Sequence, residues 1–195
     1  MMISFKSTVL SALVYFGLAR AYSGEGLRHD GSPTTRKLLF AKVHGDGNPS
    51  FYYGDVTFEF PTVAIGYTNV TYNFTGLTPG LHGMHVHTGP VGENNNCSAS
   101  FTLGHWNPGN TNHGSNLDEQ RHKGDLGNIL ADANEAASGW LLAAVQPLVG
   151  RKGIVGRSVV VHGGVDDLGL GGNQASRDAG NAGPRIACGT ITIKT

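Results

Sequence analysis

The chain has 195 residues, enough for one domain of ordinary size with a hydrophobic core. Its 14 basic and 14 acidic residues give a formal net charge of zero, and only 14% of all residues are charged. This balance argues against a nucleic-acid-binding protein and a charge-rich coiled coil, while an apolar fraction of 39% argues against intrinsic disorder.

The first 21 residues predict a signal peptide and not a part of the folded domain. Lys6 gives a weakly positive start, Val9–Ala19 is an uncharged apolar run, and Ala19-Arg20-Ala21 places small residues where a signal peptidase cuts. The alternative is a buried first helix. A membrane-spanning helix needs about 20 apolar residues, so this run predicts no membrane anchor. We therefore expect cleavage after Ala21 and a secreted, extracellular protein.

Residues 22–36 are polar and aperiodic, which predicts a flexible leader or a pro-segment. Cleavage at the predicted site would remove Lys6 and Arg20 and leave 12 basic against 14 acidic residues. From residue 37 to residue 195 the chain shows no repeat and no break in composition, and we expect a single domain there.

The pattern of this domain favours β-strands. Apolar and polar residues alternate with the period of a half-buried strand in Val56–Phe60, Val63–Tyr67, Val70–Phe74 and Ile191–Ile193. Ser158–Val161 is a short β-branched run. Trp140–Val145 is composed like a helix, but its short length and the following Pro147 favour a strand. These segments predict one all-β domain, either a sandwich or a barrel.

Two long loops, Thr88–Asp125 and Gly163–Ala187, interrupt the strands. Both are rich in Gly, Asn and Asp and poor in large apolar residues. Loops of this length in a compact domain are usually functional or disordered. A bound metal would order them.

Six of the nine histidines cluster around these loops together with one aspartate: His85, His87, His105, His113, His122, Asp125 and His162. In the segment His85-Val86-His87 an extended strand would direct both imidazoles to one side and Val86 to the core. Buried neutral histidines each need a hydrogen-bond partner, so packing alone explains such a set poorly. We therefore expect a metal site.

The segments around these residues are GLHGMHVH, GHWNPG, RHKGDLGN, VVHGGVDDLGLGGN and GNAGPRIACG. In this order, between about Arg36 and Thr195, they resemble the copper,zinc superoxide dismutases. The resemblance implies a Greek-key β-sandwich or flattened barrel of about eight antiparallel strands with two long functional loops. It also implies dismutation of superoxide to oxygen and hydrogen peroxide by alternating reduction and oxidation of copper, as antioxidant defence outside the cell.

The resemblance assigns two metal ions to the histidine set. It implies that copper is bound by His85, His87, His105 and His162, and that zinc is bound by His105, His113, His122 and Asp125. His105 would then bridge both ions after losing both ring protons. Four imidazoles suit the tetragonal preference of Cu(II), and three imidazoles with one carboxylate suit tetrahedral zinc.

The resemblance also implies roles for four residues outside the metal ligands. Asp166 matches a carboxylate that accepts a hydrogen bond from one copper histidine and one zinc histidine. Arg185 matches the arginine that attracts and orients the superoxide anion. Cys97 and Cys188 are the only cysteines, and an even pair in an exported protein suggests a disulfide. Both match the disulfide of the family.

Some features depart from the family or lie outside it. Gln174, Ala175 and Asp178 replace charges that are common in the family and thought to guide the substrate, although Arg177 lies next to them. Asn69 and Asn73 stand in acceptor motifs for N-glycosylation, which matters only in a eukaryotic source. We expect superoxide as substrate, a homodimer, and neither nucleic acid nor membrane as partner.

Two other classes of function compete with an enzyme. The main one is a non-catalytic copper- and zinc-binding module of the same fold, and the other is a β-sandwich adhesion domain. Degenerate members of the family tend to lose a ligand or the arginine. All seven candidate ligands and Arg185 are present here, which favours the enzyme.

Overall fold

The structure is a computed structural model and describes residues 38–59, 67–143 and 149–194. These residues belong to one compact unit, Arg36–Thr195. The predicted signal peptide, the predicted leader and parts of three predicted strands (residue 60, residues 63–66 and residues 144–145) lie outside the described residues.

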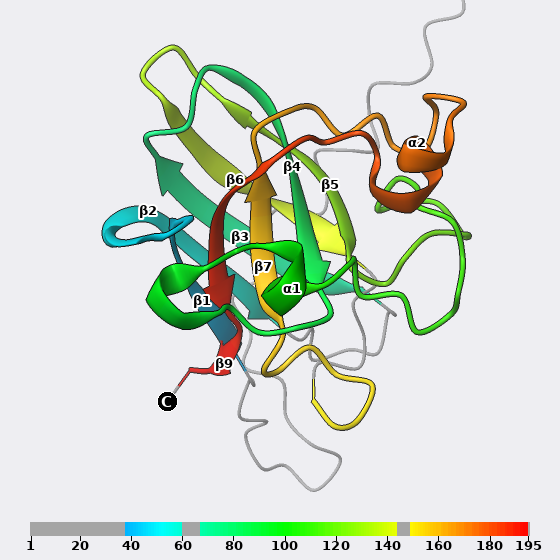
Figure 1. Ribbon diagram of the computed structural model, residues 1–195, viewed down its shortest axis with the longest axis horizontal. Helices are drawn as coiled ribbons and strands as arrows, with labels where there is room; N and C mark the ends of the chain where they lie inside the picture. The colour runs from blue at the N-terminus through cyan, green and yellow to red at the C-terminus, as the bar shows by residue number, and fades with distance from the viewer. Residues whose placement is uncertain (1–37, 60–66, 144–148, 195) are drawn as a thin grey trace, which may run out of the picture. The chain divides into compact units, whose positions relative to one another are not determined.

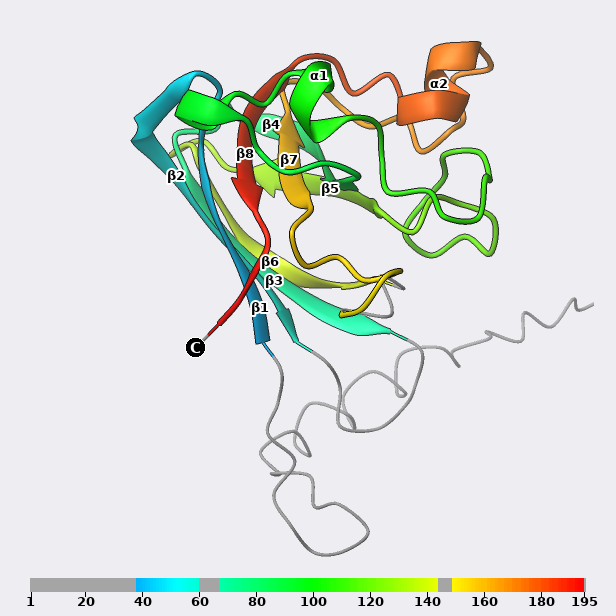
Figure 2. The same cartoon turned by 60° about the horizontal axis from the view of Figure 1, so that its bottom comes forward.

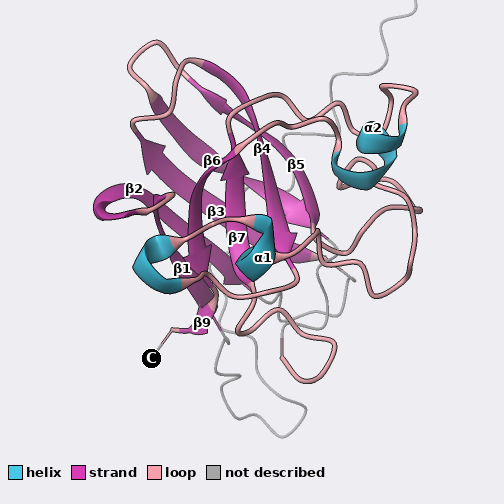
Figure 3. Cartoon of the chain, in the orientation of Figure 1, coloured by secondary structure: helices cyan, strands magenta, loops and turns pink. Residues whose placement is uncertain are grey.

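Strands dominate the described part of the chain, and its helices are short pieces within loops (Figure 3). The strands are β1 (Leu38–Gly45), β2 (Asn48–Glu59), β3 (Thr68–Thr75), β4 (Gly80–His87), β5 (Asp125–Ala131), β6 (Ala136–Ala143), β7 (Ser158–His162), β8 (Arg185–Thr190) and β9 (Thr192–Ile193). The helical segments are η1 (Glu93–Asn95), α1 (Ala99–Thr102) and α2 (Gln174–Ala179). In the described ranges no helix has the length and apolar character that crossing a membrane requires.

The strands form one antiparallel sheet in the order β5-β4-β7-β8-β1-β2-β3-β6, and the short β9 pairs with β1 (Figure 1). β5 and β6, the two ends of this order, are joined by a tight turn in which the Asp132 N–H donates to Ala136 O at 2.8 Å. They pack against each other, so the sheet nearly closes into a barrel (Figure 2). β3 pairs with β6 and not with β4, which gives the connections their Greek-key character. The predicted all-β fold is confirmed.

β4 and β5 are largely covered on both faces and gave no alternation to detect. β2, β3, β6, β7 and β9 contain the described parts of the predicted strands, apart from Tyr67 and Ile191, which lie outside the strands. In β4 every residue from His82 to His87 is buried, and most of β5 is buried too. A strand covered on both faces loses the period-two contrast that identifies a half-buried strand.

The inner face of the sheet holds the hydrophobic core. Its largest buried side chains include Leu39, Phe58, Phe74, Met84 and Ile129. The outer face of β7 and β8 holds a second, small cluster in which Val160 packs with Cys97 and Cys188. The loop that follows β4 therefore covers part of the outer face of the sheet and keeps water away from it.

Gly189 in β8 marks the closest approach between this part of the barrel and β1. A Cβ atom at this position would lie 2.0 Å from Lys42 O, a backbone atom that has no freedom to move aside. We expect Gly189→Ala to lower the free energy of unfolding by about 1–3 kcal/mol, as overpacking does in well-packed cores. Gly45→Ala in β1 is the control, because its Cβ would meet its nearest atom at 3.5 Å. Urea denaturation of both variants measures the difference, and equal stabilities would contradict the expectation.

Candidate metal centre

The candidate metal residues lie on the outer face of the barrel, beneath the two long loops. His85 and His87 belong to β4, where Met84 and Val86 alternate with them and enter the core. His162 ends β7, the neighbour of β4 in the sheet. The expectation that both imidazoles of β4 lie opposite Val86 agrees with this arrangement, and all three histidines are buried.

The loop after β4 delivers the remaining histidines to the same face. Its backbone runs beside the end of β4, where the Trp106 N–H donates to Val86 O at 2.8 Å and the Val86 N–H donates to Gly124 O at 2.8 Å. This pairing places His105 next to His87 and lets Asp125 begin β5. His105, His113, His122 and Asp125 are all buried.

The side chains form two groups that share one residue. One group contains His85, His87, His105 and His162, and the other contains His105, His113, His122 and Asp125. Within each group, one potential ligand atom per residue lies within 4.8 Å of all the others. The structure thus brings together every residue predicted to bind a metal, and His105 stands between the two groups.

The geometry of the second group fits a tetrahedral ion. Asp125 Oδ1 lies 2.9 Å from His105 Nδ1, 2.9 Å from His113 Nδ1 and 3.2 Å from His122 Nδ1. Four ligands at the usual zinc–nitrogen and zinc–oxygen distances lie about 3.3 Å apart at the corners of a tetrahedron. The other carboxylate oxygen, Oδ2, is held by the N–H groups of Gly114 (3.1 Å) and His122 (2.8 Å). The backbone therefore directs Oδ1 toward the three rings.

The tautomers of the first group follow from its hydrogen bonds. His87 Nδ1 lies 2.8 Å from Leu103 O, and His162 Nδ1 lies 3.1 Å from Gly183 O. A carbonyl oxygen only accepts, so each Nδ1 carries the proton and each Nε2 carries a lone pair. The two Nε2 atoms face each other at 3.4 Å. Two lone pairs at this distance repel unless a cation lies between them.

Two further ring nitrogens support the same interpretation. Among the described residues, His85 Nδ1 and His105 Nε2 are buried and have no hydrogen-bond partner. Burying a polar atom without a partner costs about 1–3 kcal/mol, and native structures contain few such atoms. Both residues belong to the two groups. The residues present therefore fit bound cations, and imidazole is a preferred ligand of both copper and zinc.

Burial keeps most of these imidazoles neutral. It lowers the pKa of His85 and of His162 to about 4, the pKa of His105 to about 3, and that of His87 well below 6.5. Only the neutral ring offers a lone pair to a metal, so the first group is in its binding form at neutral pH.

The carboxylates Asp125 and Asp166 raise the pKa of a neighbouring histidine, whereas burial lowers it. Burial opposes protonation of His113, but hydrogen bonds to Asp125 and Asp166 raise the pKa of His113 to about 9. Burial alone would raise the pKa values of the Asp125 and Asp166 carboxyl groups, but the neighbouring histidines lower both. Two negative charges are thus held inside the site.

Asp166 links the two groups, as the resemblance implies. Its Oδ2 accepts from His85 Nε2–H at 2.9 Å, and its Oδ1 accepts from His113 Nε2–H at 2.7 Å. Gly180, at φ +66°, leaves the space for this contact, since a Cβ there would lie 1.9 Å from Asp166 Oδ1. With Nε2 committed to Asp166, the Nδ1 of each ring is the atom left for its own group.

Arg185 begins β8 and points back to the loop after β4. Its Nη2 donates to Leu103 O at 2.8 Å, and its Nη1 donates to Thr102 Oγ1 at 3.0 Å. A disulfide joins Cys97 to Cys188 across 91 residues and ties this loop to β8. The predicted disulfide is therefore present, and it anchors the segment that holds the arginine.

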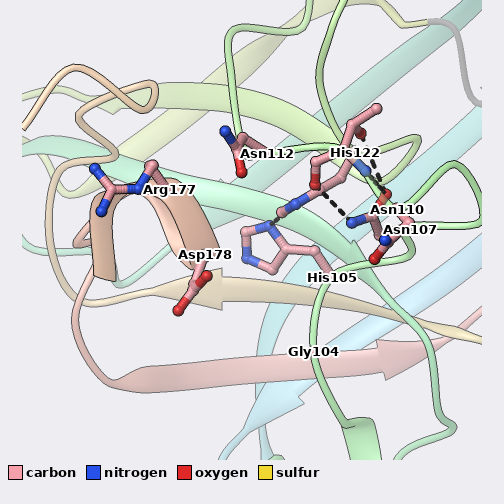
Figure 4. A pocket seen from close by; sticks show the side chains of 9 residues that line it. Gly104, His105, Asn107, Asn110, Asn112, His122, Arg177 and Asp178 are labelled. Atoms are coloured by element: carbon pink, nitrogen blue, oxygen red, sulfur yellow. Dashed lines mark hydrogen bonds between the residues drawn. The ribbon is translucent and has the colours of Figure 1, made fainter. Parts of the chain in front are cut away.

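An open polar pocket of about 390 Å³ lies beside His105 and His122 (Figure 4). Its lining includes Asn107, Asn110 and Asn112 from the loop after β4, and Arg177 and Asp178 from α2. Gln174 hydrogen-bonds to both α2 residues. Its side-chain amide accepts from Arg177 Nη2 at 3.1 Å and donates to Asp178 Oδ1 at 2.7 Å. The pocket is open to solvent and borders two of the candidate ligands.

Comparisons with known proteins agree with this geometry. The family model for copper/zinc superoxide dismutase (SODC) matches residues 52–191. A curated relative from Neurospora crassa, named superoxide dismutase (Cu-Zn), is 44% identical over 155 residues, which cover 78% of this chain and 96% of the relative. The chain belongs to the copper/zinc superoxide dismutase family.

Membership of the copper/zinc superoxide dismutase family decides between the competing functions. The protein is an enzyme that dismutes superoxide, and copper and zinc are its cofactors. The adhesion domain and the non-catalytic metal-binding module, the two alternatives left open by the motifs, are not needed to explain the buried histidines.

The site also contains residues to which the motifs assigned no role. Asn128 in β5 exchanges two hydrogen bonds of 2.8 Å with the backbone of Asp166 and fixes the linking carboxylate. Its place in the RHKGDLGN segment is a signal that could have identified it. Thr102 lies in a segment that matched no motif, and only the structure places its hydroxyl beside Arg185.

Asp166→Asn tests the link between the two groups. An amide oxygen accepts as the carboxylate does, but the amide nitrogen only donates, so one of the two rings loses its partner. We expect the affinity for zinc or copper to fall about 10- to 100-fold, the usual cost of losing such an outer partner. Metal titration of the metal-free protein against a competing chelator measures this.

Asp167→Asn is the matched control for Asp166→Asn. The Asp167 carboxylate bonds only within its own loop, to Gly169, Ser176 and Asn181. Wild-type affinity for both metals in Asp166→Asn, or an equal loss in both variants, would contradict the role assigned to Asp166.

Proposed function

We propose that His85, His87, His105 and His162 bind copper and that His105, His113, His122 and Asp125 bind zinc, with His105 shared by both ions. The observation that carries this proposal is the position of the His105 ring. Its Nδ1 lies 2.9 Å from Asp125 Oδ1 and 3.3 Å from His122 Nδ1, while its buried Nε2 has no hydrogen-bond partner. Each ring nitrogen of His105 thus serves a different group.

Superoxide dismutation transfers one electron from one superoxide ion to another and consumes two protons. Two superoxide ions and two protons yield one oxygen molecule and one hydrogen peroxide molecule. Bound copper supplies the one-electron redox chemistry, while the zinc site holds the shared ring and tunes its basicity.

In this scheme His105 Nε2 is the atom that holds a proton between the two half-reactions. It takes up a proton from solvent while the first superoxide ion gives up one electron and leaves as oxygen. It then donates this proton as the second superoxide ion is reduced, and solvent supplies the other proton of hydrogen peroxide.

Arg185 is the residue we propose for binding the superoxide anion. Its guanidinium carries a permanent charge and a rigid set of donors, and hydrogen bonds to the loop after β4 fix its orientation. With the signal peptide removed, the chain carries more acidic than basic residues, so attraction of an anion has to be local. Arg177 and Asp178 lie side by side at the pocket, and their opposite charges leave little net attraction there.

We also propose that the protein is exported and acts in extracellular antioxidant defence. Support comes from the predicted signal peptide with cleavage after Ala21, the predicted leader 22–36, and a disulfide that suits an oxidising compartment. In a eukaryotic source, Asn69 and Asn73 would be glycosylation sites, because Asn73 is exposed and Asn69 is partly exposed on β3.

A homodimer remains part of the proposal. Val155 and Ile193 are apolar and 39% and 55% exposed. Their segments lie side by side, because the Gly156 N–H donates to Ile191 O at 2.9 Å. An exposed apolar face of this kind supports self-association.

Substitution of Arg185 tests the proposed binding of superoxide. We expect Arg185→Gln to lower kcat/KM about tenfold or more and Arg185→Lys to lower it less, because lysine keeps the charge and loses the fixed geometry. Copper and zinc contents should stay at one ion each per chain. Pulse radiolysis measures the rate and elemental analysis measures the metals.

Arg151→Gln removes an exposed cation elsewhere and serves as the control for charge alone. The proposal fails if Arg185→Gln dismutes superoxide as fast as Arg151→Gln, or if its slower rate tracks lost metal.

A further inference from the structure

Three atoms of one short segment hold the guanidinium of Arg185. Nη2 donates to Leu103 O at 2.8 Å, and Nη1 donates to Thr102 Oγ1 at 3.0 Å. Nη1 also lies 3.4 Å from Cys97 O, which is long for a hydrogen bond between nitrogen and oxygen. Thr102 therefore provides the nearer acceptor for Nη1 and the only side chain among the three.

The Thr102 hydroxyl is itself held in place. Thr102 is fully buried at 0% exposure, and its Oγ1 donates to Cys97 O at 2.9 Å or to Ser98 O at 3.2 Å. A hydroxyl has one proton and two lone pairs, so it can donate to the backbone and accept from Arg185 at the same time. The hydroxyl thus hydrogen-bonds to both Arg185 Nη1 and Cys97 O, so the position of the guanidinium depends on that of the disulfide-bonded loop.

The next residue, Leu103, connects this arrangement to the first group of ligands, His85, His87, His105 and His162, which is called the copper group below. Leu103 O accepts from Arg185 Nη2 and also from His87 Nδ1, each at 2.8 Å. Leu103 has φ +60° and ψ −157°, a backbone conformation that residues with a Cβ rarely adopt and that persists only where surrounding bonds enforce it. The bonds of Thr102 to Cys97 and Ser98 lie immediately before this residue and help to enforce it.

We infer that Thr102 is a positioning residue for superoxide dismutation, whose buried hydroxyl orients Arg185 relative to the His87 side of the copper group. This inference rests on the proposed role of Arg185 in binding the anion. Orientation of Arg185 requires the hydroxyl because this group donates one hydrogen bond and accepts another. A side chain of the same volume without the hydroxyl does not orient the guanidinium. Serine preserves the hydroxyl, whereas valine preserves only the shape.

The test compares Thr102→Val with Thr102→Ser in the full chain loaded with copper and zinc. The first readout is kcat/KM for superoxide. The second is the affinity for azide, a small anion that does not react, and the visible absorption of copper is used to monitor its binding. We expect Thr102→Val to weaken azide binding and to lower kcat/KM about tenfold, the scale of one hydrogen bond to a charged group. Thr102→Ser should restore most of both.

Thr68→Val is the matched control. Thr68 is likewise fully buried, but its Oγ1 has no hydrogen-bond partner and it lies in β3. This variant should bind azide as the wild type does. Metal content and thermal unfolding of each variant are measured alongside, and Thr102→Ala replaces Thr102→Val in the comparison if the valine variant does not fold.

A double-mutant cycle separates this inference from the proposed function. In an Arg185→Gln background, Thr102→Val should cause no further loss of azide affinity, because the hydroxyl acts through the guanidinium. An equal loss in both backgrounds, an unchanged Thr102→Val, or a Thr102→Ser as weak as Thr102→Val would each overturn the inference. If Arg185→Gln itself leaves azide affinity and turnover unchanged, the proposed role of Arg185 is wrong, and the inference fails with it.

Discussion

In the proposed copper group, His85, His87 and His162 each have one ring nitrogen hydrogen-bonded to an oxygen of the protein, and the lone pair of the other nitrogen is directed inward. Leu103 O, Gly183 O and the Asp166 carboxylate take up the N–H groups of His87, His162 and His85. Lone pairs gathered in a buried space repel one another and lose their hydration. A cation removes both penalties, so we expect metal binding to stabilise the order of the surrounding loops.

The barrel makes this arrangement possible because strand alternation serves two purposes at once. In β4 one set of side chains completes the core and the other set faces the loops, so Val86 and its two histidine neighbours are fixed by the same backbone. The loops then have to cover polar rings closely, which explains part of the high glycine content. At Gly180 a side chain would collide with the carboxylate that joins the two groups.

Much of this could be predicted from the sequence, and the failures have physical reasons. Alternation located β3 and the described end of β2, since one face of each lies in the core and the other meets solvent. It did not locate β5, where the loops bury the outer face as well. The candidate ligands were found because their residue types are rare in packing and stand in recognisable segments. Thr102 escaped because a threonine in an unmatched loop carries no chemical signal until folding brings it to Arg185, 83 residues away in the chain.

The central claim is that His105 offers one ring nitrogen to each of two different metal ions. A crystal structure of the copper- and zinc-loaded protein, with anomalous scattering recorded at both absorption edges, tests it most directly. We expect a copper peak among His85, His87, His105 and His162 and a separate zinc peak among His105, His113, His122 and Asp125. A single peak, or a copper ion without contact to His105 Nε2 when copper is oxidised, would contradict it.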